Sequence, residues 1–523
     1  MGLNIKAVIR RSLSKPRFLL SSFRQFITNI SWNVLGKLGV QLVLLAVSIT
    51  VTRYLGKERL GIYASLLVIP VFVRLLNSMG IETLINKLLP ELKVHDPTGN
   101  QGKYILNFSL WFRLATSLGF GTAIYFLLPF YLNFISMPQL LDYRVPIALY
   151  FMVLTLNSLF STLFMTLLRY KVVSIVDISG ALVNLALLGL FIHLDFGILG
   201  VLYAFVCATG ISILVYGFLA RKDFAGETQK PRWGDAKNLA GVSYAISLLS
   251  FGLMTQSDIF LMNYFQISPV GIGYYHLATG LAAMLIFLLT GTGSLALSLF
   301  SENYARNKSA GLSQTWYEVV GFTIFCMVPI YTFSLFHAEQ LISFIYGTQF
   351  SPAGSVFSVY LVFVMFSLFM GAGFSVSTLY VIHQRDAALR SSVEGSILNV
   401  VLNIILIPFF GVMGTVVATG SSMVYMAGRQ LLCISRTLDV AKILPFIGRC
   451  VFLSLVPILP CKIIALFVVD HLLLNLLVYG IGLIGMLFWV KPLTGEHCRL
   501  MGEINPGLVR WIKYFAEKPA IID

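Results

Sequence analysis

Long apolar runs, separated by short polar connectors, fill most of the chain. They predict membrane-spanning helices, because one span needs about 20 predominantly apolar residues. About fourteen spans are expected, near residues 31–52, 60–80, 105–131, 145–168, 173–194, 198–220, 239–262, 271–299, 316–336, 354–381, 389–409, 412–434, 444–467 and 472–490. The longest connectors, 81–104 and 221–238, are polar, and no segment fits a soluble domain.

The amino-acid composition supports a membrane protein. The 523 residues are 57% hydrophobic and 11% charged, whereas soluble domains carry about 25% charged residues. The six cysteines form no CxxC pair, so neither a metal site nor a disulfide framework is indicated. The first apolar run lacks the short core and small-residue cleavage site of a signal peptide, so we expect a retained first helix.

The net charge of +15 follows the predicted topology. With the N-terminus in the cytoplasm, 28 of the 37 Lys and Arg residues fall in inner segments and four in outer loops. This asymmetry is the positive-inside signal, and it favours a cytoplasmic location for both termini. The basic excess is therefore expected to contact anionic lipid headgroups, and nucleic acid is not an expected partner.

The two halves of the chain share motifs in the same order. Gly61-Ile62-Tyr63 opens the second span, and Gly273-Tyr274-Tyr275 opens the eighth. Gly197-x-x-Gly200-x-x-x-Ala204 matches Gly411-x-x-Gly414-x-x-x-Ala418. Small residues at such spacing let helices pack closely in lipid. Because spans 1 and 7 both start inside, the repeat predicts two pseudo-symmetric six-helix bundles with a central substrate path.

The expected fold class is an all-α integral membrane protein with two such bundles and two additional C-terminal helices. Six segments follow from the predicted boundaries: a basic cytoplasmic N-terminal tail at 1–30, an N-terminal bundle at 31–220, a cytoplasmic linker at 221–238, a C-terminal bundle at 239–435, two further helices at 436–490 and a cytoplasmic C-terminal tail at 491–523.

Several strings between about residues 31 and 435 form a signature. Arg53-Tyr54-Leu55-Gly56 leads into Leu60-Gly61-Ile62-Tyr63, Asp258 precedes Gly271-x-Gly273-x-Tyr275-x-x-Ala278, and Tyr346-Gly347 is followed by Phe350. The most specific string is Asn399-x3-Asn403-Ile404-x-Leu406-Ile407-Pro408-x2-Gly411-x2-Gly414-x3-Ala418-Thr419. Together they resemble the polysaccharide-transporter family of the multidrug/oligosaccharidyl-lipid/polysaccharide flippase superfamily.

The resemblance implies a MATE-like fold and a flippase for polyprenyl-pyrophosphate-linked oligosaccharides, such as O-antigen or exopolysaccharide precursors, in a bacterial inner membrane. It implies as partners the lipid-linked oligosaccharide, membrane lipids and other polysaccharide-assembly membrane proteins. The residues that it marks as structural are Gly61, Tyr63, Gly273, Tyr275, Asn399, Asn403, Pro408, Gly411 and Gly414.

Three basic residues fall within the first three predicted spans. Lys37, Arg74 and Arg113 lie six to eight residues from inner ends, which is about 9–12 Å deep at 1.5 Å per residue. Charges inside spans are costly and suggest function. We expect these three side chains to form a basic shelf that binds a pyrophosphate through charge-assisted hydrogen bonds. Snorkelling to headgroups, or pairing with internal acids, is the alternative.

Acidic residues within spans are candidates for gating or for binding a coupling ion, either H⁺ or Na⁺. Asp258 lies near the outer end of span 7, and Asp177 and Glu394 lie near inner ends of their spans. Structural capping is an equal alternative for Asp258, and solvated or paired roles are the alternative for the other two. No catalytic constellation, metal site or cofactor is indicated.

Two other functions compete with a glycan flippase. A multidrug antiporter of the same superfamily would move organic cations and would need acids in its cavity, yet span 1 offers Lys37 and no acid. A membrane-embedded glycan polymerase or ligase would need a large polar outer loop, and the predicted outer loops are short. The sequence therefore favours a transporter over an enzyme.

Overall fold

The computed structural model describes residues 16–96, 98–231, 233, 236–249, 255–290, 293–467 and 470–491. Within these ranges the side chains of 16–35 and of Lys37, among others, are not described. The predicted C-terminal tail, apart from residue 491, and the first fifteen residues lie outside the described residues. All regular secondary structure in the described ranges is helical, as the sequence predicts.

The chain forms two compact units. Unit 1 comprises Met1–Tyr54 and Ile69–Leu248, and unit 2 comprises Leu55–Val68 and Leu249–Asp523. Helix α2 (Pro16–Ser78) supplies residues to both. It is interrupted at Gly56, where φ is 71° and ψ is 178°. Glycine adopts this conformation without steric cost, and the interruption falls between the first two predicted spans.

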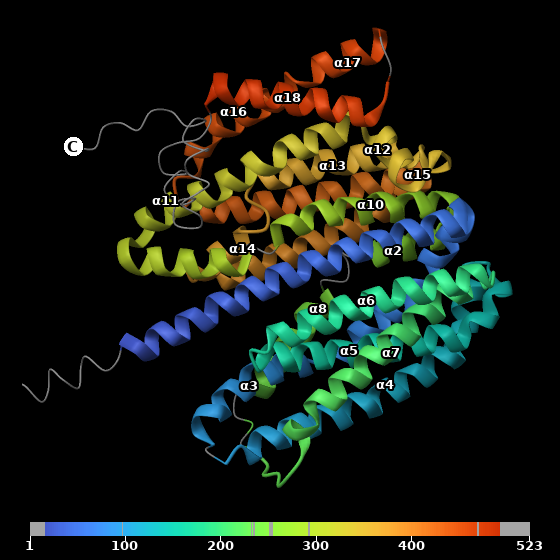
Figure 1. Cartoon of the computed structure of the whole chain (residues 1–523), viewed down its shortest axis with the longest axis vertical. Coiled ribbons are helices and arrows are strands. Elements are labelled where there is room, and N and C mark those ends of the chain that lie inside the picture. The colour runs from blue at the N-terminus through green and yellow to red at the C-terminus, as the bar shows by residue number, and fades with distance from the viewer. Residues whose placement is uncertain are drawn as a thin grey trace, which may run out of the picture. The chain divides into compact units, whose positions relative to one another are not determined.

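Unit 1 is a bundle of helices (Figure 1). Besides its part of α2 it contains α3 (Ile81–His95), α4 (Asn100–Phe134), η1 (Pro138–Tyr143), α5 (Arg144–Thr166), α6 (Tyr170–His193), α7 (Gly197–Phe224) and α8 (Ala236–Leu249). Helix α5 packs against α3, α4 and α7, and α6 packs against α7. Apolar side chains such as Ile85, Leu163 and Tyr216 form the core between them.

Helix α3 occupies much of the connector at 81–104 that the sequence pattern marks as polar. Its residues Ile81, Leu84, Ile85 and Leu88 are buried, and this spacing of three and four places them on one face of a helix. That face joins the core formed with α4 and α5. The connector is thus largely an amphipathic helix that belongs to the bundle.

Unit 2 contains the remaining helices, which are α9 (Thr255–Tyr264), α10 (Pro269–Thr290), α11 (Gly293–Phe336), α12 (Ala338–Tyr346), η3 (Thr348–Phe350), α13 (Ala353–Phe369), α14 (Ser375–Val381), α15 (Arg385–Ile434), η4 (Val440–Ile443), α16 (Leu444–Leu455), α17 (Ile458–Phe467) and α18 (Leu472–Val490). Helix α15 packs against α9, α13 and α14, and α10 packs against α13. Helix α15 is interrupted at Gly411, where φ is 56° and ψ is −130°.

Ten helices within the described ranges are long and apolar enough to cross a membrane. Two of them, α2 and α15, each hold two predicted spans on either side of an interrupting glycine. Other predicted spans are divided between shorter helices, such as α13 and α14. The expected number of fourteen spans therefore stays a prediction.

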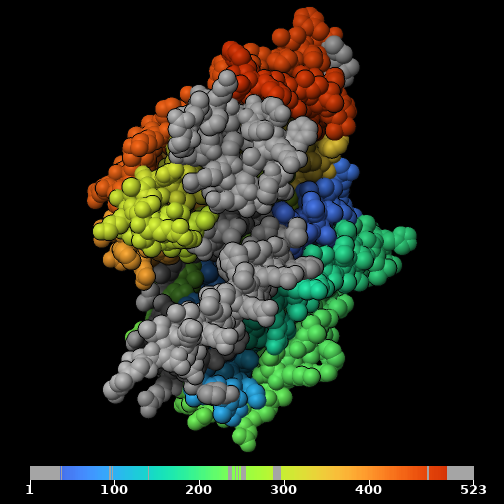
Figure 2. All heavy atoms as spheres, turned by 60° about the vertical axis from the view of Figure 1, so that its left-hand side comes forward, coloured from blue at the N-terminus to red at the C-terminus, as the bar shows by residue number. Residues whose placement is uncertain are grey.

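Large apolar side chains are exposed along these helices. Leu214 is 74% exposed, Phe409 79% and Phe467 83%. Helices α17 and α18, which are red in Figure 2, carry several such residues. A water-soluble protein rarely exposes extended apolar surface, whereas lipid accommodates it. The chain is thus a multi-pass, all-α integral membrane protein.

Candidate functional site

The most fully connected polar cluster in the described residues surrounds Asp258 in unit 2. Its carboxylate accepts hydrogen bonds from the Tyr275 hydroxyl at 2.5 Å and the Thr419 hydroxyl at 2.9 Å. The side-chain amides of Asn399 and Asn403 donate to it, each at 2.9 Å. All five side chains are buried. We call these five residues the Asp258 cluster.

Three helices bring the Asp258 cluster together. Asp258 lies on α9 and Tyr275 on α10, while α15 supplies Asn399, Asn403 and Thr419. Asn399 and Asn403 are four residues apart, so they share one face of the helix. Thr419 follows the interruption at Gly411 and comes from the second half of α15. Helix α15, which carries the signature string, thus contacts Asp258 from both sides of its interruption at Gly411.

Hydrogen-bond donors, rather than a basic side chain, compensate the buried Asp258 carboxylate. A buried carboxylate is costly unless its charge is compensated, and within the described residues no basic side chain forms an ion pair with Asp258. The carboxylate, hydroxyl and amide groups offer the oxygen ligands that hard cations prefer. The amide oxygen of Asn403 has no hydrogen-bond partner in the described structure, and rotation of that amide would turn the oxygen toward the carboxylate.

The other two predicted acids have simpler surroundings. Asp177 on α6 is partly buried in unit 1 and accepts a hydrogen bond from the Tyr216 hydroxyl at 2.9 Å. Glu394 on α15 accepts from Arg429 and from Tyr425, both at 3.1 Å, at the surface of unit 2. Neither belongs to the Asp258 cluster. Among the three acids, Asp258 alone combines complete burial with four donors.

Arg113 connects three helices in unit 1. Its guanidinium donates to the backbone carbonyls of Asn77 and of Ser78, the last residues of α2, and to Glu82 in the first turn of α3 at 2.6 Å. The Arg113 side chain is fully buried. Basic side chains stabilise the carbonyl end of a helix in this way. The structure therefore gives Arg113 the paired environment that was the alternative to a substrate contact.

Arg74 has different surroundings from Arg113. It lies on the unit 1 part of α2 and is partly buried. Within the described structure it has no hydrogen bond or ion pair. The Lys37 side chain lies outside the described residues. Of the predicted basic shelf, Arg74 is thus the described side chain without an acid partner in the described structure.

The repeated glycines Gly61 and Gly273 lie where two segments of unit 2 approach closely. A side chain at Gly61 would collide with the backbone carbonyl of Pro269, and one at Gly273 would reach within 2.8 Å of the Lys57 carbonyl. The Tyr63 ring packs edge-on against His276 at 6.5 Å between centroids. The two copies of the Gly-x-Tyr motif thus mark a contact between α2 and α10.

Gly61→Ala is expected to destabilise the protein, because overpacking against a backbone costs about 1–3 kcal/mol. Gly280→Ala on α10 is the matched control, since a side chain there meets open space and alanine favours helix over glycine by about 1 kcal/mol. Thermal unfolding of the purified variants should show a lower midpoint for Gly61→Ala alone. Equal midpoints would contradict the close contact.

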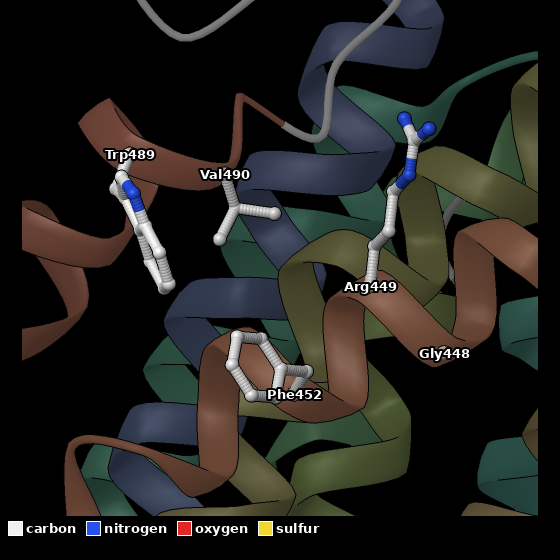
Figure 3. Close-up of a pocket in the computed structure, with 5 residues that line it drawn as sticks. All are labelled: Gly448, Arg449, Phe452, Trp489 and Val490. Atoms are coloured by element: carbon white, nitrogen blue, oxygen red, sulfur yellow. The ribbon is translucent and has the colours of Figure 1, made fainter.

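Apart from the Asp258 cluster, unit 2 has a cavity between its last helices. This cavity of about 450 Å³ is lined by Gly448, Arg449 and Phe452 from α16 and by Trp489 and Val490 at the end of α18 (Figure 3). The Phe452 and Trp489 rings lie 6.2 Å apart between centroids, and both are substantially exposed. Aromatic residues with such exposure are typical of a membrane interface.

Comparisons with known proteins agree with the signature strings. A family model described as "Polysaccharide biosynthesis protein" matches residues 50–355, more than half of the chain. The chain belongs to this family. The predicted resemblance to polysaccharide transporters is therefore confirmed.

A relative named "Probable low-salt glycan biosynthesis flippase Agl15", from Haloferax volcanii, is 22% identical over 197 residues. The alignment covers 37% of this chain and 41% of the relative, so it spans less than half of that protein's length. The relative is named as a flippase, which accords with the expectation of a transporter rather than an enzyme.

Solved structures share the fold. The lipid II flippase MurJ, in an inward closed conformation, matches with a TM-score of 0.69 at 14% identity, over 87% of this chain and 97% of that one. An inward-facing multidrug resistance transporter of the MATE family, in the MOP superfamily, matches with a TM-score of 0.64 at 15% identity, over 77% of this chain and 96% of that one. The predicted MATE-like fold is confirmed.

Sequence reasoning singled out Asp258, Tyr275, Asn399 and Asn403 separately, but it did not join them. The available signal was the four-residue separation of Asn399 and Asn403, which places both polar side chains on one face of a helix. Thr419 stood in the signature string without an assigned role, although its hydroxyl contacts Asp258. The pairing of Arg113 with Glu82 was also missed, because these residues lie 31 positions apart on different helices.

Proposed function

We propose that the protein is a flippase that moves polyprenyl-pyrophosphate-linked oligosaccharide units across the bacterial inner membrane for surface polysaccharide biosynthesis. The observation that carries this proposal is membership of a polysaccharide biosynthesis family by a chain with a transporter fold. A relative and a structural neighbour that are both named as flippases support it. The lipid-linked unit is the substrate, and membrane lipids and other assembly proteins are partners.

The topology that we propose has fourteen spans with both termini in the cytoplasm. The first twelve would form two six-helix bundles, at 31–220 and 239–435, and the last two would follow at 436–490. The distribution of Lys and Arg supports this orientation. The interruptions at Gly56 and Gly411 support it too, because each falls where a pair of predicted spans would turn.

Arg74 and Lys37 are the residues that we propose to contact the pyrophosphate. Phosphate oxygens accept charge-assisted hydrogen bonds from guanidinium and ammonium groups. Arg74 lacks an acid partner in the described structure, which supports a ligand role. Arg113 would position Arg74 without contacting the substrate, because it binds the end of α2, the helix that carries Arg74.

We further propose that the Asp258 cluster binds the coupling ion, either H⁺ or Na⁺. Binding of a monovalent cation would neutralise the buried carboxylate. Occupancy would therefore change the net charge enclosed by α9, α10 and α15. A ligand shifts a conformational equilibrium only through different affinities for the two states. The proposed coupling therefore requires that the cation bind more tightly in one transport conformation than in the other.

Loss of the protein distinguishes a glycan flippase from a multidrug antiporter. We expect cells lacking it to accumulate complete, unpolymerised lipid-linked units, because the units would not reach the polymerisation machinery. Loss of a drug antiporter would instead sensitise cells to cationic dyes and leave surface glycan normal. Extraction and mass analysis of lipid-linked glycans, with a dye-resistance assay on the same cells, make the comparison. Dye sensitivity with normal glycan would reject the flippase proposal.

A further inference from the structure

A cavity of about 800 Å³ opens in unit 1, away from the Asp258 cluster. It lies where the connection between α3 and α4, the connection between α5 and α6 and the end of α7 meet. Its charged lining residues are Asp96, Lys103, Arg169, Lys222 and Asp223. In the predicted topology all three segments are on the cytoplasmic side of the membrane.

Asp96 is engaged within its own loop. It accepts hydrogen bonds from the Thr98 hydroxyl at 2.6 Å, the Gln101 backbone amide at 2.7 Å and the Thr98 backbone amide at 3.1 Å. These bonds hold the pKa of the Asp96 carboxyl below its ordinary value. The carboxylate thereby caps the first turn of α4, because it accepts from the backbone amide of Gln101 in that turn.

The second acid of the lining, Asp223, forms an ion pair, unlike Asp96. Both oxygens of Asp223 accept from the Arg169 guanidinium, at 2.6 and 2.9 Å. A bidentate pair of this kind fixes both side chains and neutralises both charges. Lys103 and Lys222 are left as lining cations that form no ion pair within the described structure. The cavity therefore holds two ammonium groups that suit an anion.

The rest of the lining is apolar. Leu89 and Leu106 are buried in the unit 1 core beside the cavity. Leu167 and Leu168 complete this side, and Leu168 is 53% exposed. A lining that combines two lysines with several leucines matches a ligand with an anionic head and a hydrocarbon part. A phospholipid at the membrane surface has this chemistry, whereas a free sugar has neither the charge nor the apolar surface.

We propose that this cavity binds the phosphate headgroup of a membrane phospholipid, with Lys103 and Lys222 contacting the phosphate. The site would couple lipid composition to the positions of α4 and α7, the helices that carry the two lysines. The proposal does not depend on the identity of the transported substrate, so it can fail while the flippase proposal stands.

Titration of the delipidated full-length protein with phosphatidylglycerol, followed by native mass spectrometry, tests the site. The double variant Lys103→Gln/Lys222→Gln is expected to bind the lipid about tenfold or more weakly, as the loss of charge-assisted hydrogen bonds implies. Lys103→Arg/Lys222→Arg should retain binding, because the positive charges remain. Lys230→Gln is the matched control, since Lys230 is exposed in the neighbouring linker and does not line the cavity.

Competition with sn-glycerol 1-phosphate identifies the source of the phosphate. Displacement of the lipid by millimolar glycerol phosphate would assign the site to soluble phosphate esters, and it would overturn the phospholipid proposal. Lack of displacement, with weaker lipid binding in the double glutamine variant, would support it. Unchanged lipid binding in that variant, or an equal loss in Lys230→Gln, would also overturn it.

Discussion

Asp258→Asn is expected to reduce transport by about 100-fold, which corresponds to about 2.7 kcal/mol, without unfolding the protein. The substitution removes the negative charge that would hold a coupling cation and keeps the shape of the side chain. The amides of Asn399 and Asn403 can rotate to present oxygens to the new amide, so the hydrogen bonds of the cluster can be re-formed. Transport of the lipid-linked unit in reconstituted vesicles measures the effect.

Ion dependence separates a coupling role for Asp258 from a purely structural one. The wild-type protein should gain thermal stability when sodium replaces potassium, or when the pH is lowered, because a ligand that binds the folded state stabilises it. Asp258→Asn should lose that response. Glu394→Gln is the control, because Glu394 forms an exposed ion pair of the kind worth at most about 1 kcal/mol. Retention of the full response in Asp258→Asn would contradict the proposal.

Arg74→Ala and Arg113→Ala are expected to fail in different ways. Arg113→Ala would leave Glu82 and the carbonyls of Asn77 and Ser78 without their buried partner. Removing one side of a buried ion pair costs about 3–5 kcal/mol, so the folded protein should be depleted from the membrane. Arg74→Ala should leave abundance near normal and abolish export.

Abundance and export measured together distinguish these two outcomes. Quantitative blotting of the membrane fraction reports folding, and surface glycan reports export. Arg74→Lys should keep part of the export activity, since the charge remains but the bidentate fork of the guanidinium is lost. Full export by a Lys37→Ala/Arg74→Ala double variant would exclude both residues as the phosphate site. Loss of Arg74→Ala from the membrane would instead assign Arg74 a structural role.

The sequence predicts helix boundaries best where an apolar run stands between tight connectors. Helix α5 (Arg144–Thr166) and helix α6 (Tyr170–His193) match their predicted spans within three residues. Helix α3 was not predicted, because charged residues interrupt its apolar residues along the sequence, and a search for continuous apolar runs passes over it. The spacing of Ile81, Ile85 and Leu88 carries the missing signal.

The contacts of the candidate site could not be predicted in the same way. Asp258 is 141 positions from Asn399 and 161 from Thr419, so only the packing of α9 against α15 brings them together. The depth of a charge along a span is readable from the sequence, which placed Arg74 and Arg113 at one level. The neighbours of each charge are tertiary contacts, and these give the two arginines different surroundings.

Leaflet-resolved detection of the lipid-linked oligosaccharide in cells lacking the protein tests the central claim most directly. An impermeant lectin applied to spheroplasts reports units on the outer leaflet, and the same lectin after permeabilisation reports the total. We predict that complete units accumulate on the inner leaflet and become accessible only after permeabilisation. Accumulation of single units on the outer leaflet would contradict the flippase account, because translocation would then have occurred without this protein.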